Sequence, residues 1–364
     1  MEEFIQSASS LFLNVIEIRP QQLIMWLIGA ILIYLAIKKN MEPTLLLPMG
    51  FGAILVNLPN SGAVTPLDAA GQFIPGEEKG IIDVLFGFGI VNELFPLLLF
   101  IGIGAMIDFG PLLSNPKMLL FGAAAQFGIF FTLSLAALMG FRLEDAASIG
   151  IIGAADGTNS IFISNYFNSE YAGVIAVAAY SYMALVPIIQ PPVIKLITTR
   201  KERLIRMEYK EKSVSKATRI LFPIIITVIA GLVAPRSVAL IGFLMFGNLI
   251  RECGVLKSLS ESAQKELANL ITLLLGLTIA TRMQADQFLK LETLFILGLG
   301  LVAFVFDTIG GVFFAKFLNL FTKNKINPMI GATGISAFPM SARVIHKMGL
   351  AEDPQNFLLM HAVG

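Results

Sequence analysis

Cysteine, histidine and charged residues are all scarce in this sequence. Cys253 is the only cysteine, which excludes an internal disulfide and a cysteine-based metal cluster. The two histidines, His346 and His361, are too isolated to predict a metal site. Charged residues make up 14% of the chain, whereas a soluble domain typically has about 25%. No Gly-x-x-x-x-Gly-Lys-Ser/Thr loop is present, so we expect no nucleotide hydrolysis by this chain.

What the sequence has instead is long apolar runs. Hydrophobic residues make up 56% of the chain, and several runs approach the roughly 20 residues that cross a bilayer. The composition therefore predicts an all-α polytopic membrane protein. The N-terminus has neither a basic region nor a small-residue cleavage site, so we expect its first run to be a retained helix. The predicted spans are 22–37, 42–58, 94–107, 118–139, 171–197, 220–233, 238–249, 270–280 and 291–314.

Basic residues indicate the orientation of these spans. The segment 200–219 holds eight basic and three acidic residues and is the most basic loop in the chain. The positive-inside rule places this loop, with Lys38 and Lys39, in the cytoplasm and the N-terminus outside. The run 81–90 is too short to span, and we expect it to lie at the interface.

A carboxylate lies in the middle of one apolar region, in the segment 147–167. Asp156 is surrounded there by glycines and by small hydroxyl and amide side chains. An ionised carboxylate in hydrocarbon costs about 2.5–3.5 kcal/mol even on the lenient insertion scale. The glycines allow the helix to break and to free carbonyl oxygens that can bind a cation. We interpret the segment as an intramembrane cation site on a broken helix; the alternative is an Asp that only hydrogen-bonds a neighbouring helix.

A second Gly-rich segment, 327–343, predicts another broken helix. Ile152-Gly-Ala-Ala-Asp-Gly157 resembles Ile330-Gly-Ala-Thr-Gly334, and each follows two apolar runs whose predicted orientations are opposite. This pattern predicts two inverted repeats, each with a broken or re-entrant helix near the membrane midplane. The predicted divisions are an N-terminal scaffold (1–91), a first repeat (92–199), the basic loop (200–219), connecting spans (220–269) and a second repeat (270–364) whose last span looks cut off.

The second broken segment supplies neutral oxygens suited to sodium, from Asn327, Thr333, Ser336 and Ser341. The alternatives are that Asn327 starts a helix before Pro328 and that Ser336 is a helix–helix contact. Arg343 is suited to bind a carboxylate in a bidentate way, or it extends its guanidinium to the interface.

Two further polar residues lie in apolar surroundings. Asp307 is either a second ion ligand or the partner of Arg282 or Lys316. Tyr182 either donates a proton or hydrogen-bonds a kinked helix.

The chain resembles the β subunits of the sodium-pumping, biotin-dependent decarboxylases, which act on oxaloacetate, methylmalonyl-CoA, glutaconyl-CoA or malonate. The resemblance covers nearly the whole chain. The segments that carry it are Glu42-Pro-Thr-Leu-Leu-Leu-Pro-Met-Gly-Phe-Gly52, Gly150-Ile-Ile-Gly-x-Ala-Asp-Gly157, Ala176-Val-Ala-Ala-Tyr-Ser-Tyr-Met-Ala-Leu-Val-Pro187, Gln190-Pro-Pro192, Asp307-Thr-x-Gly-Gly311 and Asn327-Pro-x-Ile-Gly-Ala-x-Gly-x-Ser336 with Arg343.

The resemblance implies that this subunit decarboxylates carboxybiotin, exports Na⁺ and consumes a proton from outside. Asp156 and the set Asn327, Gly331 and Ser336 would bind sodium, and Arg343 and Tyr182 would serve carboxybiotin or proton movement. The family usually continues Asp-Gly-Pro-Thr, whereas Thr158-Asn159 follows here, and Asn159 is a candidate extra oxygen.

Several partners follow from the same resemblance. The chain lacks the Ala/Val-Met-Lys-Met type of biotin attachment site, consistent with biotin on a separate carrier. We expect a carboxyltransferase subunit, a small membrane-anchoring subunit and a homo-oligomer, no nucleic acid, and a bacterial or archaeal inner (cytoplasmic) membrane. The rival function is a sodium-coupled carboxylate secondary transporter. A purely structural anchor ranks last, because it leaves Asp156 without a purpose.

Overall fold

The computed structural model describes residues 18–39, 43–65, 79–114, 116–207, 214–322 and 325–363, and every regular element among them is helical. Among these residues, five helices are long and apolar enough to cross a membrane, or up to seven if two bent pairs each form one span. The prediction of a multi-pass helical membrane protein is therefore confirmed. The inverted repeat and the re-entrant course of the broken helices stay predictions. Parts of two predicted loops, 66–78 and 208–213, lie outside the described residues.

The chain divides into two compact units, residues 1–95 with 269–295 and residues 96–268 with 296–364. The described elements of the first unit are α2 (Pro20–Lys39), α3 (Pro43–Val56), α4 (Ile81–Phe86), the π-helical turn η1 (Gly87–Val91), most of α16 (Ala268–Ile279), η6 (Ala280–Met283) and α17 (Ala285–Phe288).

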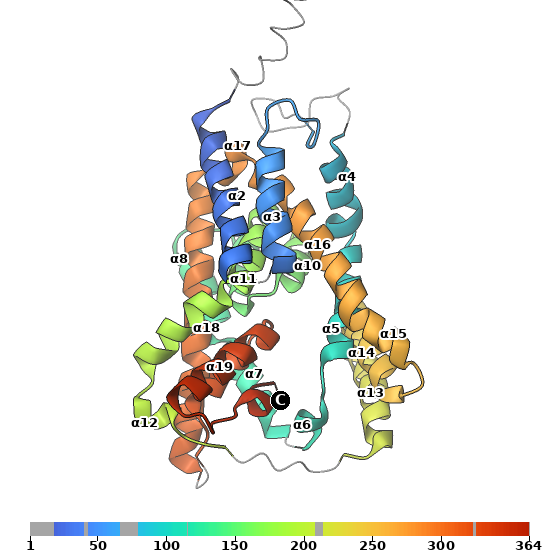
Figure 1. Cartoon of the computed structure of the whole chain (residues 1–364), viewed down its shortest axis with the longest axis vertical. Coiled ribbons are helices and arrows are strands. Elements are labelled where there is room, and N and C mark those ends of the chain that lie inside the picture. Colours follow the sequence, from blue (N-terminus) through green and yellow to red (C-terminus); the bar gives the residue numbers. More distant parts are fainter. Residues whose placement is uncertain are drawn as a thin grey trace, which may run out of the picture. The chain divides into compact units, whose positions relative to one another are not determined.

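Close helix packing at glycines organises the first unit. The helices α2 and α3 run side by side in Figure 1, and a Cβ on Gly29 would lie 2.6 Å from the carbonyl oxygen of Gly50. Asn57, at the end of α3, donates to the Met283 carbonyl at 2.8 Å and accepts from the Ala285 N–H at 2.8 Å. These bonds satisfy backbone groups that the turn between η6 and α17 leaves open.

The second unit contains the remaining helices and both predicted broken segments. Its elements are most of α5 (Leu94–Met106), α6 (Gly110–Ser114), η2 (Pro116–Met118), α7 (Leu119–Ala125), α8 (Phe127–Leu138), α9 (Leu143–Gly150), η3 (Ile151–Ala154), α10 (Gly157–Tyr166), α11 (Ala172–Ile197), α12 (Arg200–Arg203), α13 (Lys216–Val233), η4 (Pro235–Ser237), α14 (Val238–Cys253), α15 (Lys257–Ser262), η5 (Ala263–Leu267), α18 (Leu291–Phe321), η7 (Pro328–Thr333), α19 (Phe338–Glu352) and α20 (Leu359–Val363).

Two long helices, α11 and α18, frame the core of this unit. Aromatic rings join α18 to α8, since Phe131 and Phe306 stack with ring centroids 4.1 Å apart. The region predicted as one span at 118–139 contains one candidate membrane span, Leu119–Leu138, with a break of a single residue at Gln126 between α7 and α8. The run predicted to lie at the interface forms α4 and η1, and with α5 it makes a pair bent by 57°.

Candidate functional site

The first predicted break is present as a sharp interruption of the backbone. Ala155 has a left-handed conformation (φ 50°) and Asp156 an extended one, so the 3₁₀ turn η3 ends and α10 begins anew. A left-handed conformation costs a non-glycine residue roughly 1–2 kcal/mol. Such strain is typical of functional sites held by surrounding structure, and Ala155 is fully buried.

Asp156 is the N-cap of α10. Its Oδ1 accepts from the Asn159 N–H at 3.1 Å and its Oδ2 from the Asn159 side-chain amide at 2.6 Å. The carboxylate thus lies at the positive end of a helix dipole, which stabilises its ionised form. Asn159 thus donates both its backbone N–H and its side-chain amide to the Asp156 carboxylate.

Gly157 lets an aromatic ring approach the same break. A Cβ at this position would lie 2.2 Å from the ring of Tyr180 on α11. Tyr180 is almost fully buried. The ring therefore fixes the first turn of α10 and, with it, the direction of the Asp156 side chain.

The second predicted break is also present. Asn327 caps the 3₁₀ helix η7, and α19 starts only at Phe338, after a turn that contains Ser336. Asn327 is fully buried. Its amide donates to the carbonyls of Arg203 and Ile205, each at 2.9 Å, and its Oδ1 accepts from Met329 N–H. The alternative interpretation of Asn327 as a helix start is therefore confirmed, and both of its amide hydrogens are engaged.

A buried amide to which the sequence analysis gave no role in the site supports this second break. Gln190 on α11 donates to the Ala332 carbonyl at 3.0 Å and accepts from Ser341 at 2.7 Å. The position of Gln190 within an apolar segment was the available signal, because a buried polar group requires partners.

Ser336 and Arg343 are exposed. Neither side chain makes a hydrogen bond or ion pair within the described part of the chain. An unpaired guanidinium is suited to bind an anion from outside the chain, and Lys347 is exposed one turn further along α19.

Gly331 lies against α18. A Cβ on Gly331 would lie 2.0 Å from the Gly311 carbonyl oxygen, and the reverse distance is also 2.0 Å. This backbone contact is a packing role that the sequence did not predict for Gly331.

Asp307 lies four residues before Gly311 on α18 and is fully buried. Its Oδ1 accepts from the Ile129 N–H of α8 at 3.1 Å. A Cβ on Gly153 would lie 2.5 Å from its Oδ2. The partners proposed from sequence are engaged elsewhere, since Lys316 lies 3.0 Å from Glu202 and Arg282 stacks over Phe86.

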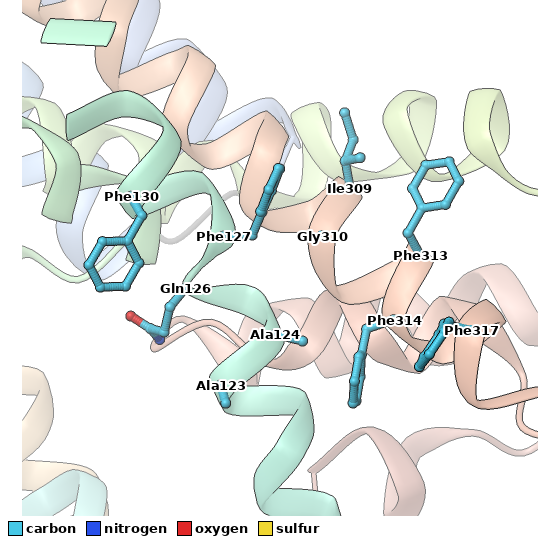
Figure 2. Close-up of a pocket in the computed structure, with 10 residues that line it drawn as sticks. All are labelled: Ala123, Ala124, Gln126, Phe127, Phe130, Ile309, Gly310, Phe313, Phe314 and Phe317. Carbon is cyan, nitrogen blue, oxygen red and sulfur yellow. The ribbon is translucent and has the colours of Figure 1, made fainter. Parts of the chain in front are cut away.

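Gly310 lies on α18 between Asp307 and Gly311, and it packs against the junction between α7 and α8. Its Cβ position lies 2.8 Å from that of Phe127. Figure 2 shows Phe127 directed toward α18 beside Gly310, with Gln126 directed the other way. Five phenylalanines line the open cavity of about 630 Å³ at this junction, so it is apolar.

Tyr182 is mostly buried and donates a hydrogen bond to the Leu297 carbonyl of α18. Its ring packs on Gly300, where a Cβ would lie 2.9 Å from it. The hydroxyl thus hydrogen-bonds a helix, as the second of the two alternatives predicted.

The two breaks share one buried cluster. Ala155, which precedes Asp156, belongs to the same core as Ile335 and Ala337, which flank Ser336, and as Ala342, which precedes Arg343. Asp156, Ser336 and Arg343 therefore all follow directly on residues of this cluster. Asp307 and Tyr182 lie instead at contacts of α18.

An ion-pair cluster connects α12 to the end of α19. Arg203 binds Glu352 at 2.7 Å, and Arg206 binds Asp353 at 2.6 Å. The hydrogen bond from Arg203 holds the pKa of Glu352 below its usual value. Both pairs hold the segment whose carbonyls accept hydrogen bonds from the Asn327 amide.

Comparison with known proteins assigns the family. A family model described as the Na⁺-transporting oxaloacetate decarboxylase beta subunit matches residues 21–364. The chain belongs to this family. It is 49% identical to the methylmalonyl-CoA decarboxylase subunit beta of Propionigenium modestum, across 94% of this chain and 89% of that protein.

Two further relatives have different named substrates. The glutaconyl-CoA decarboxylase subunit beta of Acidaminococcus fermentans is 48% identical, across 94% of this chain and 87% of that protein. The oxaloacetate decarboxylase beta chain of Klebsiella pneumoniae is 44% identical, across 97% and 92%. The chain is thus a membrane subunit of a decarboxylase sodium pump, and its relatives' names as subunits indicate a multisubunit complex.

Proposed function

We propose that this subunit decarboxylates carboxybiotin carried by a separate subunit and couples the reaction to Na⁺ export. In the reaction the bond between the biotin ring nitrogen and the carboxylate carbon breaks, CO₂ leaves, and the nitrogen takes up a proton from outside. The observation that carries the proposal is the Asp156 carboxylate at the start of α10, in a break that shares its core with the second break.

Sodium is a hard cation that binds oxygen ligands. We assign it to the Asp156 carboxylate with the side-chain oxygens of Asn159 and Ser336. The Asn327 Oδ1 and the Gly331 carbonyl are further candidates, although both have packing or capping contacts. The family's Asp-Gly-Pro-Thr is replaced here, so the Asn159 oxygen would be particular to chains with this variation.

The roles of Arg343 and Tyr182 differ. Arg343 would bind the carboxylate of carboxybiotin, because its guanidinium is exposed and a planar fork matches a carboxylate. Tyr182 would move a proton only by releasing the Leu297 carbonyl that it now binds. We therefore assign Tyr182 first to holding α11 against α18.

The partners proposed are a biotin carrier, a carboxyltransferase, a small membrane-anchoring subunit and further copies of this chain. The membrane is the inner membrane of a bacterium or archaeon. Affinity purification of the tagged full chain from its native membrane should recover a biotinylated protein, and recovery of the chain without one would contradict this assignment.

The deciding experiment is CO₂ release from free carboxybiotin by the purified protein in liposomes, with and without Na⁺. Release that requires Na⁺ and is accompanied by Na⁺ movement supports the pump. Sodium-coupled uptake of a dicarboxylate without CO₂ release would instead establish a secondary transporter.

A further inference from the structure

The carboxylate of Asp307 is fully buried, yet only one of its oxygens is engaged. Oδ1 accepts from the Ile129 N–H at 3.1 Å. Oδ2 is fully shielded and has no hydrogen-bond partner within the described residues. Two oxygens of one carboxylate thus have opposite environments.

Oδ1 has a clear structural role. The helix α8 begins at Phe127, and the preceding Gln126 makes no side-chain cap. The first N–H groups of a helix lack partners within it, so Asp307 supplies from α18 the acceptor that Gln126 does not. The positive end of the α8 dipole also favours negative charge on Oδ1.

Oδ2 requires a different explanation. It lies so close to Gly153 that a Cβ there would be 2.5 Å away. A buried, ionised oxygen without a donor is costly. A bound cation or a proton would each remove this cost.

The surroundings favour the proton. A hard cation typically takes about six oxygen ligands. On the elements with described contacts to Asp307, the one other buried side-chain oxygen without a partner is Oγ1 of Thr132, one turn beyond Gly128 on α8. A proton needs no such shell, and it fits the close approach of Gly153.

Few charges face this carboxylate. The helix α8 and the turn η3 contain no titratable residue. The nearest ones along the packed elements are Asp156 after η3, Tyr182 on α11, which packs on Gly300, and Glu292 and Lys316 near the ends of α18. Lys316 is paired with Glu202 at 3.0 Å, so no described cation lies beside Asp307 to compensate its charge.

We propose that Asp307 is a proton-binding site within the membrane-spanning part, protonated at Oδ2 in one state of the protein and ionised in another. The site exchanges one proton with the carboxylate and forms no other bond. Because Oδ2 lies against Gly153, three residues before Asp156, its protonation would act directly on the first break. The further statement that Asp307 carries the proton consumed in the pump cycle rests on the proposed function.

Infrared spectroscopy of the purified full chain tests the site without any need for turnover. The wild type should show a protonated carboxylic-acid C=O band that shifts in D₂O and is lost in Asp307→Asn. Asn keeps the Oδ1 acceptor for Ile129, so the cap on α8 is preserved. Asp145→Asn is the matched control, since Asp145 is also buried but is bonded to Ser169 at 2.6 Å, and this variant should keep the band. A band that is unchanged in Asp307→Asn would overturn the proposal.

Liposome assays then test the role in the cycle. Asp307→Asn should slow CO₂ release about 100-fold, within the range for lost acid–base catalysis, with an unchanged half-saturating Na⁺ concentration. A raised half-saturating Na⁺ concentration with normal proton uptake per CO₂ would reassign Asp307 as a sodium ligand and overturn the proposal. Failure of the wild type to move Na⁺ would contradict the proposed function. The infrared result would still decide whether Asp307 binds a proton, because it does not depend on transport.

A misfolded Asp307→Asn variant does not remove the test. An infrared pH titration of the wild type and of Asp156→Asn is then the test. Asp156 is the other candidate acid near the first break, and this variant removes it while Asp307 is kept. A carboxylic-acid band that titrates in both proteins supports the site. Its absence at every pH would overturn it.

Discussion

Gly311 and Gly331 meet backbone to backbone, each with its carbonyl oxygen 2.0 Å from the position that a Cβ on the other would occupy. The first glycine belongs to the long helix α18 and the second to η7. Neither position has room for a methyl group. The contact joins two segments that are separated by only a short stretch of chain but belong to different helical elements.

Alanine at either glycine should therefore be equally harmful. Gly311→Ala and Gly331→Ala should each lower the free energy of unfolding by about 1–3 kcal/mol or more, the usual cost of overpacking. Gly298→Ala on the same α18 is the control, because nothing lies within 4 Å of its Cβ position. Thermal unfolding in detergent measures all three. If only Gly331→Ala lost Na⁺ stimulation and both variants were stable, the glycine would act as a ligand and not through packing.

The charge of Asp156 can be separated from its capping role. Asp156→Asn keeps an acceptor for the Asn159 N–H, so assembly and stability should be retained while Na⁺-dependent decarboxylation is abolished. Asp156→Ala should in addition cost about 1 kcal/mol of stability, because it removes an N-cap. Near-normal sodium stimulation of the Asn variant would contradict the sodium assignment.

Arg343 should matter for activity and not for folding. Arg343→Lys keeps a positive charge but loses the planar fork. We expect a markedly raised KM for carboxybiotin at unchanged thermal stability. Lys347→Arg, one turn away on the same exposed face, should have normal kinetics. Unchanged kinetics of Arg343→Lys would reduce that guanidinium to a surface charge.

Asn327 should behave primarily as a structural residue. Asn327→Ala removes the side-chain donor to the Ile205 carbonyl and one of the two side-chain donors to the Arg203 carbonyl. Each buried group left unsatisfied costs about 1–3 kcal/mol. Trypsin should then cleave faster in the Arg200–Arg206 segment, measured by mass spectrometry of the fragments. Asn356→Ala, which removes another donor to Arg203, should give a smaller effect of the same kind.

The Arg203–Glu352 pair predicts a defined pH dependence. The pKa of Glu352 is lowered in the folded protein from its ordinary value of 4.5. The stabilisation is therefore fully present above that value and is lost as the pH falls through the lower, folded-state pKa. Glu352→Gln should be less stable than the wild type near pH 7, and the difference should shrink as the pH falls below 4.5. A difference in unfolding temperature that is independent of pH would contradict this account.

Sequence patterns predicted the helices and the positions of both breaks. Long apolar runs show where spans lie, and glycines beside Asp156 and in 327–343 show where a helix is interrupted. Patterns did not predict that Asn327 is turned into the protein and Ser336 outward, because burial depends on contacts between distant segments. The same limit applies to Tyr180 on Gly157 and to Gln190 on Ala332. Each of these contacts depends on how α11 packs, which no local spacing encodes.

The helix α18 touches three interruptions within less than two turns. Asp307 contacts the start of α8 and the turn η3, Gly310 contacts the α7–α8 junction, and Gly311 contacts η7. None of these three interruptions can straighten or shift alone without losing its contact with α18. The three interruptions therefore behave as one rigid group. Any conformational change that opens the ion path alternately to the two sides would have to move all three together, and the hinge would have to lie elsewhere in the chain.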